Sequence, residues 1–293
     1  MDEDRLNALL QKFPHIRVLV IGDFFLDKYL IIDRQLREIS LETGLEAHQV
    51  IAIRTSPGAA GTVTSNLRAL GVQVTVLGII GDDGQGYELK RGLVERGVDI
   101  APLLEVADRF TPTYTKPMVR EADGHEHEIE RLDIKNRSPL PRHLEDALLE
   151  RLRALVPQVD GVVIADQVPE RNCGVVTDRV RAEIANLALQ HADKVFIADS
   201  RARIGLFEQV MIKPNTREAT LAVHPHWAGE IDLETARQSG AELFRRNQKE
   251  VFLTVGAEGI LLFTSQGCQH IPAVPVKGEI DIVGAGDSVM AGI

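Results

Sequence analysis

The sequence is poor in cysteine and aromatic residues, with two Cys, one Trp and 4% aromatics among 293 residues. Cys173 and Cys268 stand far apart and show no metal-ligand or redox spacing, so we expect reduced thiols in a cytoplasmic protein. No apolar run reaches the ~20 residues that a membrane helix needs. The acidic residues 1–4 are not followed by the apolar segment of a secretory signal. The sequence therefore predicts neither a membrane partner nor a secretory signal.

A surplus of positive charge is also missing, because the formal net charge is −10 at pH 7. General nucleic-acid binders normally carry a basic face, so no nucleic-acid partner is expected. This charge does not exclude an anionic substrate, since backbone amides and one or two basic side chains often hold phosphates. With 44% hydrophobic residues, the chain can bury the core of one large α/β domain, with or without a small appendage.

Two common nucleotide-binding motifs are absent. No G-x-x-x-x-G-K-[ST] string occurs, which argues against a Walker-type loop. The first strand runs into Gly22-Asp23 followed by two phenylalanines, and Val289 stands where a third glycine would follow Gly284 and Gly286. A dinucleotide-binding oxidoreductase is therefore not expected.

Strand-like and helical patterns alternate along most of the chain. The apolar run at residues 17–21 is typical of a strand buried on both faces. Further strands are expected at residues 48–54, 73–80, 161–165, 194–198, 210–212, 250–255 and 259–264. Helices are expected at residues 63–70, 88–96, 144–155, 174–191 and 231–247, and from Gly284 onward. This alternation predicts an α/β fold with a doubly wound, mostly parallel sheet.

Residues 111–133 have a different pattern. Apolar and charged residues alternate there, and Asp123-Gly124 is a hairpin signal. We expect two antiparallel strands with one wet face, which together with residues 24–50 would form a small β lid beside the main sheet. His125 and His127 would share a face of such a strand, but no third metal ligand follows at a fitting spacing, so we interpret them as part of a charged lid strand.

The string DIVGAGDS at residues 281–288 is the most informative segment. Glycines at a helix start let backbone N–H groups approach a phosphate closely. The amides of Gly284, Ala285 and Gly286 would then stabilise the charge of a transferring phosphoryl group, and Asp287 would accept the proton of the attacking hydroxyl. The alternative is a simple turn that begins a helix, with Asp287 as an acidic residue that the helix dipole stabilises.

This string resembles the DxxGAGD signature of the ribokinase-type (PfkB) carbohydrate kinases. The resemblance covers essentially the whole chain, and its further elements occur in the family's order: GD at 22–23, PGAA at 57–60, GIIGDDG at 78–84, KPNTRE at 213–218 and TVGAEG at 254–259. The resemblance implies one kinase domain over residues 1–293, with a ribokinase-like fold and a small β lid, that uses ATP to phosphorylate a sugar or sugar phosphate.

The resemblance also implies substrate-binding residues. Asp23 matches an acid that contacts sugar hydroxyls, and Gly58 and Asn66 match residues that hold or frame the sugar. Asp166 is a further candidate from the residues themselves, because ligands gather at the C-terminal ends of strands in such sheets. A strand-to-loop cap explains Asp166 equally well.

Cofactor sites follow from the resemblance in the same way. Asn215 and Glu218 match the N-x-x-E element that positions Mg²⁺, through water since Mg²⁺ keeps much of its hydration shell. The carbonyls of Asp281 and Val283 match a site for a monovalent cation, K⁺. The nucleotide loop corresponds to Thr254, Gly256 and Gly259.

Within the family, the sequence is most similar to the heptose-phosphate kinase branch, the kinase half of a heptose kinase/adenylyltransferase. Residues 26–29, 37–40, 115–116 and 131–133 carry this likeness. Lys116 and Arg131 would suit heptose 7-phosphate, a sugar that already bears a phosphate, although solvated lid charges explain them equally well. The resemblance also implies a homodimer through lid strands and, in the full gene, a fused nucleotidyltransferase domain.

Some positions depart from the family pattern. Ala59 and Thr62 stand where a second glycine and an asparagine are usual, which leaves the identity of the sugar open. The segments at 167–170 and 199–201 differ from the heptose branch. The chain stops at Ile293, about two turns into the helix that Asp287 opens, whereas family members continue. We therefore expect either a fragment that is truncated at its C-terminus or a catalytically impaired, non-catalytic sugar- or nucleotide-binding protein with the same fold.

Overall fold

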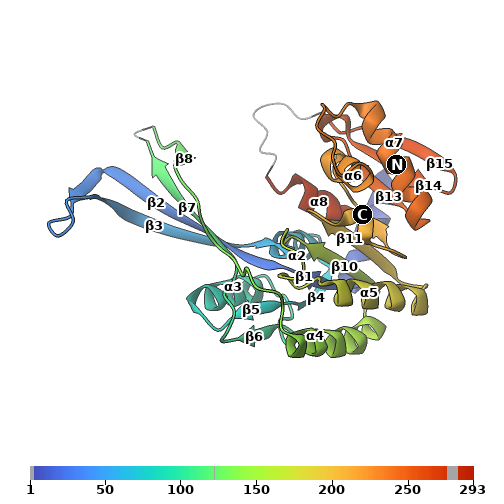
Figure 1. Ribbon diagram of the computed structural model, residues 1–293, viewed down its shortest axis with the longest axis horizontal. Coiled ribbons are helices and arrows are strands. Elements are labelled where there is room, and N and C mark those ends of the chain that lie inside the picture. The colour runs from blue at the N-terminus through green and yellow to red at the C-terminus, as the bar shows by residue number, and fades with distance from the viewer. Residues whose placement is uncertain (1–2, 122, 276–282) are drawn as a thin grey trace.

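An eight-stranded sheet forms the centre of the protein (Figure 1), whose computed structural model describes residues 3–121, 123–275 and 283–293. Its strands are β1 (Arg17–Gly22), β4 (Gln73–Leu77), β10 (Gly161–Asp166), β11 (Val195–Ser200), β12 (Met211–Ile212), β13 (Val251–Thr254), β14 (Ile260–Thr264) and β15 (Gly267–Ile271). They lie in the order β15-β14-β13-β12-β11-β10-β1-β4, and all pairs from β4 to β13 are parallel. The predicted α/β fold with a mostly parallel sheet is confirmed.

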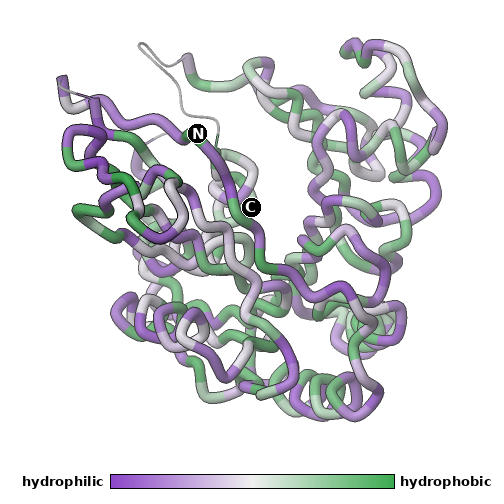
Figure 2. Tube along the Cα trace, turned by 60° about the vertical axis from the view of Figure 1, so that its left-hand side comes forward, coloured by the Kyte–Doolittle hydropathy of each residue, from purple (hydrophilic) through white to green (hydrophobic). Residues whose placement is uncertain are grey.

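Helices cover both faces of this sheet. Within β1, Leu19 and Ile21 pack into one core, while Val18 and Val20 pack into the other, since successive side chains of a strand point to opposite faces. In Figure 2 the helices carry both apolar and polar residues, as expected when only one side of each packs on the sheet. The first core is covered by α4 (Arg142–Leu155), α5 (Asp178–Gln190), α6 (Thr216–Val223) and α7 (Leu233–Asn247), and the second by α2 (Ala60–Ala69), α3 (Gly84–Glu95) and α8 (Ala285–Gly292).

A second, five-stranded sheet projects from this body as a long arm (Figure 1). It consists of β2 (Phe24–Ile39), β3 (Glu46–Ala59), β7 (Thr113–Arg120), β8 (Glu126–Glu128) and β9 (Leu132–Ile134). The order is β3-β2-β7-β8, with β9 also paired to β7. These are the segments predicted as the lid, except that β3 extends to Ala59. Gly124 lies between the antiparallel strands β7 and β8 at φ 85°, in agreement with the hairpin signal.

Residues 73–80 form two strands instead of the single β-rich segment that we predicted. The chain bends at Gly78, where a Cβ would lie 2.8 Å from the carbonyl oxygen of Gly22, so only glycine permits this close approach. The part after the bend, β5 (Ile79–Gly81), pairs with β6 (Leu104–Val106) in a separate two-stranded sheet.

Other differences lie at the ends of the elements. Strand β15 continues the sheet beyond the predicted last strand, and α5 begins at Asp178, where the side chain of Thr177 caps it, instead of at residue 174. Helix α1 (Glu3–Leu10) buries none of its residues. Short 3₁₀ helices occupy Phe13–His15, Val156–Gln158, Ile204–Leu206 and Gly256–Glu258. Within the described ranges, no helix is long and apolar enough to cross a membrane.

Candidate active site

The N-terminus of α8 lies against α2. Gly284 caps α8 at φ 77°, a left-handed conformation that suits glycine. A Cβ on Gly284 would stand 3.6 Å from Cγ2 of Thr62, and the Asn66 side chain donates a hydrogen bond to Ser288 Oγ at 3.2 Å. The amides of the first turn lack intrahelical acceptors and carry the positive end of the helix dipole. This arrangement suits an anion beside the first turn of α8.

Asp287 stands in that first turn, among other charged groups. Partial burial raises the pKa of the Asp287 carboxyl group to about 6, and the negative charge of Asp199 raises it further, while Lys213 and Arg201 oppose the shift. The carboxylate of Asp27, on the arm, also raises it. Asp199 and Lys213 belong to the ends of β11 and β12 and Asp27 to the arm, so Asp287 lies within the electrostatic influence of all three elements. A carboxylate with such a pKa is ionised at neutral pH and can still accept a proton.

Lys213 forms a buried ion pair with Asp199 beneath the helix start, with 3.3 Å between Lys213 Nζ and Asp199 Oδ2. A Cβ on Gly286 would lie 3.5 Å from the same Nζ. The ammonium group therefore lies close to the first turn of α8. The sequence marked Lys213 and Asp199 only as members of motif strings, although both follow buried strands, and that position is the signal that could have identified them.

Asn215 and Glu218 form the capping box of α6. Asn215 Oδ1 accepts from the Glu218 amide and Glu218 Oε2 accepts from the Asn215 amide, each at 2.8 Å. Burial raises the pKa of the Glu218 carboxyl group to about 7, and the charge of Asp199 adds to the shift, while Lys213 opposes it. A cation with its water shell would favour the ionised form of this carboxyl group, which burial and the charge of Asp199 disfavour.

The loop after β13 joins the capping box. Thr254 donates its amide to the Pro214 carbonyl at 2.9 Å and pairs with Asn215 in a β-bridge. Gly256 and Gly259 adopt φ values of 62° and 99°, and a Cβ on Gly259 would lie 2.2 Å from a backbone oxygen of Ile271. The structure therefore brings together the residues that the sequence suggested for nucleotide and Mg²⁺. Val283 is 78% exposed, and Asp281 lies outside the described residues.

Asp23 is buried and organises the segment 167–175. Its Oδ2 accepts from the amides of Gln167 and Val168 at 2.8 and 3.0 Å, and its Oδ1 accepts from the Val175 amide at 2.7 Å. Burial raises the pKa of the Asp23 carboxyl group to about 6, and the charge of Asp166 adds to the shift. These contacts give Asp23 a backbone-fixing role, and contact with a sugar stays a prediction.

Asp166 is also fully buried at the end of β10. Its Oδ1 accepts from Arg203 Nη2 at 2.5 Å and its Oδ2 accepts from the Ser200 hydroxyl at 2.6 Å. Arg203 also donates to the carbonyls of Val168 and Pro169, at 2.6 and 2.8 Å. These hydrogen bonds are the ones expected if Asp166 caps the end of the strand and holds the following loop, which was one of its two interpretations from the sequence. Contact of Asp166 with a substrate stays a prediction.

Asp27 is a site residue that the sequence analysis did not single out. It lies on the face of β2 that carries Tyr29, and its carboxylate pairs with Lys116 Nζ at 3.0 Å. A Cβ on Gly58 would lie 2.3 Å from Asp27 Oδ2, so the missing side chain of Gly58 leaves room for this carboxylate. Lys116 also lies 4.8 Å from the centre of the Tyr29 ring.

Arg131 lies on the same part of the arm. It makes two hydrogen bonds to the Asp133 carboxylate, at 2.8 and 3.1 Å, and its guanidinium lies 4.7 Å from the centre of the Tyr114 ring. His125 and His127 stack with ring centroids 6.3 Å apart at β8. In the described part of the chain, no three His, Cys, Asp or Glu side chains come together as a direct metal site.

Known proteins resemble this chain in both sequence and fold. The model of the pfkB family of carbohydrate kinases matches residues 20–293. The bifunctional protein HldE of Trichlorobacter lovleyi is 30% identical over 99% of this chain and 57% of its own length, so the chain spans little more than half of this relative. Escherichia coli phosphofructokinase-2 with fructose-6-phosphate has a TM-score of 0.65 at 19% identity, covering 94% of this chain and 85% of that one. Cryptococcus neoformans ribokinase with ADP has a TM-score of 0.61 at 20% identity, with the same coverage.

Proposed function

This chain belongs to the pfkB family of carbohydrate kinases, and we propose that it transfers the γ-phosphoryl group of ATP to a hydroxyl of a sugar phosphate. The observation that carries this proposal is the position of Asp287, in the first turn of α8 and within the electrostatic reach of Lys213 and Asp27. Phosphoryl transfer needs positioned charge stabilisation and an oriented nucleophile, and this arrangement supplies groups for both.

In the proposed reaction, Asp287 accepts the proton of the acceptor hydroxyl. The hydroxyl oxygen bonds to the γ-phosphorus, and the bond from that phosphorus to the β–γ bridging oxygen breaks, so that ADP leaves. The amides of Gly284, Ala285 and Gly286 hold the charge that develops on the transferring group. Lys213, next to Gly286, adds a positive charge on the same side.

Kinases of this family use ATP with Mg²⁺, and the residues fit such a pair. Asn215 and Glu218 would orient the water shell of Mg²⁺, because a cation favours the ionised form of Glu218, which burial and then the charge of Asp199 disfavour. The nucleotide would lie along the loop that contains Thr254, Gly256 and Gly259. A K⁺ ion at the carbonyls of Asp281 and Val283 is proposed from the resemblance alone.

The acceptor would bind on the arm face that includes Asp27 and Lys116, next to Gly58. Asp27 can accept hydrogen bonds from sugar hydroxyls, and Lys116 and Arg131 can receive a phosphate. We propose heptose 7-phosphate as the acceptor, supported by the resemblance of the arm segments to the heptose branch and by the similarity to HldE.

Two further proposals concern partners. Strand β3 is an edge of the five-stranded sheet and exposes Val50, Ile51 and Ile53 by 44, 43 and 59%, a surface that a second copy of this chain could cover. Light scattering on the parent and on an Ile53→Asp variant tests the homodimer, and a monomeric parent at micromolar concentration would contradict it. The length of the bifunctional relatives supports a fused nucleotidyltransferase domain in the full gene.

The kinase proposal is tested by measuring ADP release with Mg²⁺-ATP and heptose 7-phosphate. We expect release that depends on the sugar, and a drop in kcat of about 10²–10⁴-fold in Asp287→Asn with ATP affinity retained. Equal rates in the two proteins would rule out Asp287 as the base. ATP binding without turnover of any sugar phosphate would favour a non-catalytic protein of the same fold.

A further inference from the structure

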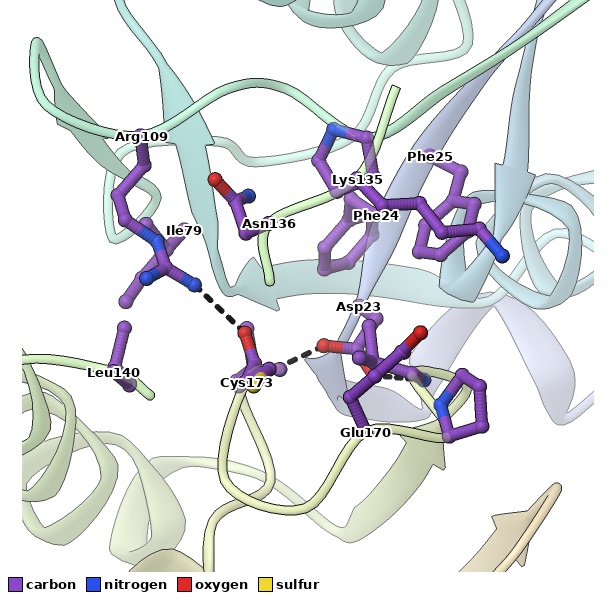
Figure 3. A pocket seen from close by; sticks show the side chains of 15 residues that line it. Asp23, Phe24, Phe25, Ile79, Arg109, Lys135, Asn136, Leu140, Glu170 and Cys173 are labelled. Atoms are coloured by element: carbon purple, nitrogen blue, oxygen red, sulfur yellow. Dashed lines mark hydrogen bonds between the residues drawn. The ribbon is translucent and has the colours of Figure 1, made fainter. Parts of the chain in front are cut away.

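A pocket opens beside Asp23, between two segments that follow strands of different sheets (Figure 3). One wall comes from residues 135–140, after β9, and the other from residues 168–175, after β10. Phe25 lies between them, and its ring meets the edge of the Tyr114 ring with centroids 5.0 Å apart. Of its lining residues, only Asp23 was a candidate for sugar binding from the sequence, and the two walls carried no assignment.

Hydrogen bonds through the body of the protein fix both walls. The guanidinium of buried Arg109 donates to the Ser138 carbonyl at 3.0 Å and to the Cys173 carbonyl at 2.7 Å, so one side chain ties the two walls together. Asn136 exchanges two hydrogen bonds with the backbone of Phe110, at 3.0 and 2.8 Å. The pocket is therefore pre-formed, which lowers the ordering cost for a ligand.

Glu170 provides a hydrogen-bond acceptor that the protein itself does not use. Its Oε2 is buried, and within the described residues it has no hydrogen-bond partner. Figure 3 shows Glu170 on the side of the pocket opposite Phe25 and Lys135. Because an unsatisfied buried carboxylate oxygen is costly, a hydroxyl donor from a ligand would gain the full benefit of that bond.

Lys135 supplies a positive charge to the same pocket. Its Nζ lies 3.5 Å from Asp133 Oδ2 and 5.7 Å from the Tyr114 ring centre. The same Asp133 carboxylate also pairs with Arg131. Asp23 and Glu170 also line the pocket, but on the side opposite Glu170 one carboxylate faces two cations, and this local surplus of positive charge suits an anionic group on a ligand.

Strand β2 leads from the pocket toward the proposed reaction centre. Phe25 and Asp27 lie on one face of this strand, roughly 7 Å apart at ~3.3 Å per residue. The charge of Asp27 in turn reaches Asp287, whose pKa it raises. A sugar that presents one hydroxyl to Asp287 would extend its remote carbons past Asp27 toward Phe25.

We propose that this pocket is an acceptor-specificity subsite, in which Glu170 accepts a hydrogen bond from a remote sugar hydroxyl and Lys135, with Arg131, binds the acceptor's phosphate. This proposal rests on the proposed function, because it assigns the acceptor of that same site. It adds Glu170 and Lys135 to the residues that determine specificity. The phosphate would contact both Arg131 and Lys135, the two side chains that pair with Asp133.

The test compares heptose 7-phosphate with the same heptose without its phosphate, using Lys135→Met and Glu170→Gln. For Lys135→Met we expect the KM for the phosphorylated sugar to rise about tenfold or more, with kcat and the KM for the unphosphorylated sugar nearly unchanged. For Glu170→Gln the KM for both sugars should rise. Lys135→Arg keeps the charge and should restore most of the preference for the phosphorylated sugar.

Matched controls come from the ion pair between Lys90 and Glu105, whose side chains are 30 and 38% exposed. Neither residue lines the pocket, so Lys90→Met and Glu105→Gln should leave both KM values unchanged. Calorimetric titration of heptose 7-phosphate without ATP gives a readout apart from turnover, and Lys135→Met should weaken this binding by a similar factor.

The two proposals fail in different ways. If the parent phosphorylates the sugar phosphate while Lys135→Met and Glu170→Gln keep the parent's KM values and affinity, the subsite is overturned and the kinase proposal stands. If the folded parent neither binds nor turns over a sugar phosphate, the proposed function itself fails. If Lys135→Arg raised the KM for the phosphorylated sugar as much as Lys135→Met, the charge of Lys135 would not bind the phosphate, and this part of the proposal would also be overturned.

Discussion

Lys213 and Asp199 form a buried ion pair, 3.3 Å apart, at the ends of adjacent strands under the N-terminus of α8. Burial raises the pKa of the Asp199 carboxyl group, and the charge of Lys213 opposes this shift. Lys213 therefore has two separable effects. It favours the ionised form of Asp199 against the effect of burial, and it presents a positive charge to the proposed phosphoryl site.

The first prediction separates these effects. Lys213→Met leaves an unpaired buried carboxylate and should lower the free energy of unfolding by about 3–5 kcal/mol, measured by urea denaturation. The double variant Lys213→Met with Asp199→Asn should regain most of that stability and yet remain at least about tenfold slower than the parent in ADP release. A double variant with parental activity would show that the ammonium plays no part in the reaction.

The second prediction concerns the pH dependence of activity. The pKa of Asp287 is raised to about 6 and that of Glu218 to about 7, and both groups would act when ionised. The parent's kcat/KM should therefore fall below pH 7 and fall more steeply below pH 6. In Glu218→Gln, kcat/KM should fall only once, near pH 6, as Asp287 becomes protonated. If kcat/KM of this variant did not fall near pH 6, the assignment of Asp287 as the base would be wrong.

The third prediction concerns stability and pH. The folded-state pKa of Asp287 exceeds its ordinary value of 3.8, so the folded protein binds this proton more tightly than the unfolded chain. The group therefore costs stability above pH 6, and the cost disappears as the pH falls toward 4. Asp287→Asn should unfold at a higher temperature than the parent at pH 8, with the difference closing near pH 4.

Asp232 provides a control of opposite sign for that experiment. It caps α7 by accepting from the Thr235 amide at 2.8 Å, and hydrogen bonds from the Thr235 side chain and amide lower the pKa of its carboxyl group. Asn is also a good helix cap, so Asp232→Asn should give no gain in stability at pH 8. If Asp287→Asn proved less stable than the parent at pH 8, the sign derived for Asp287 would be wrong.

The fourth prediction tests the close approach of Gly58 to Asp27. Gly58→Ala puts a methyl group where the Asp27 carboxylate now lies, so it should displace this carboxylate from Lys116. The KM for the acceptor should rise about tenfold, while the affinity for ATP stays constant. Gly84→Ala is the control, because a Cβ there meets nothing within 4 Å. Equal acceptor KM values in both variants would remove Asp27 from the acceptor site.

The fifth prediction concerns Mg²⁺. A glutamine at position 218 can still accept from the Asn215 amide, so Glu218→Gln should keep the capping box. Because the pKa of Glu218 is raised to about 7 in the folded protein, its ionised form costs stability at pH 8, and the variant should unfold there at a temperature no lower than that of the parent. Its lost charge should raise the Mg²⁺ concentration for half-maximal rate by about tenfold. A stable variant with the parent's Mg²⁺ dependence would show that Glu218 does not help to position the ion.

Much of the fold follows from local patterns. The apolar run in β1 reflects a strand whose two faces are both buried, and it was predicted from periodicity. Strand β7 lies where the alternating sequence pattern predicted a strand, and most of its residues are half-buried. Strand β15 was missed because its residues are all exposed and carry no such pattern. The break at Gly78 was missed because it depends on contact with residues about 50 positions earlier.

The sequence by itself determined the order of strands and helices, the glycine-rich start of α8 and the acid in its first turn, because caps, turns and buried strands are properties of short segments. Only the tertiary structure decided which charges meet. Asp27 reaches Asp287, Lys213 pairs with Asp199, and Glu170 faces Lys135 across a pocket. The partners of Asp27 and Glu170 lie far away in the chain, and Lys213 meets Asp199 because β11 and β12 are neighbours in the sheet, so no local pattern records these relationships.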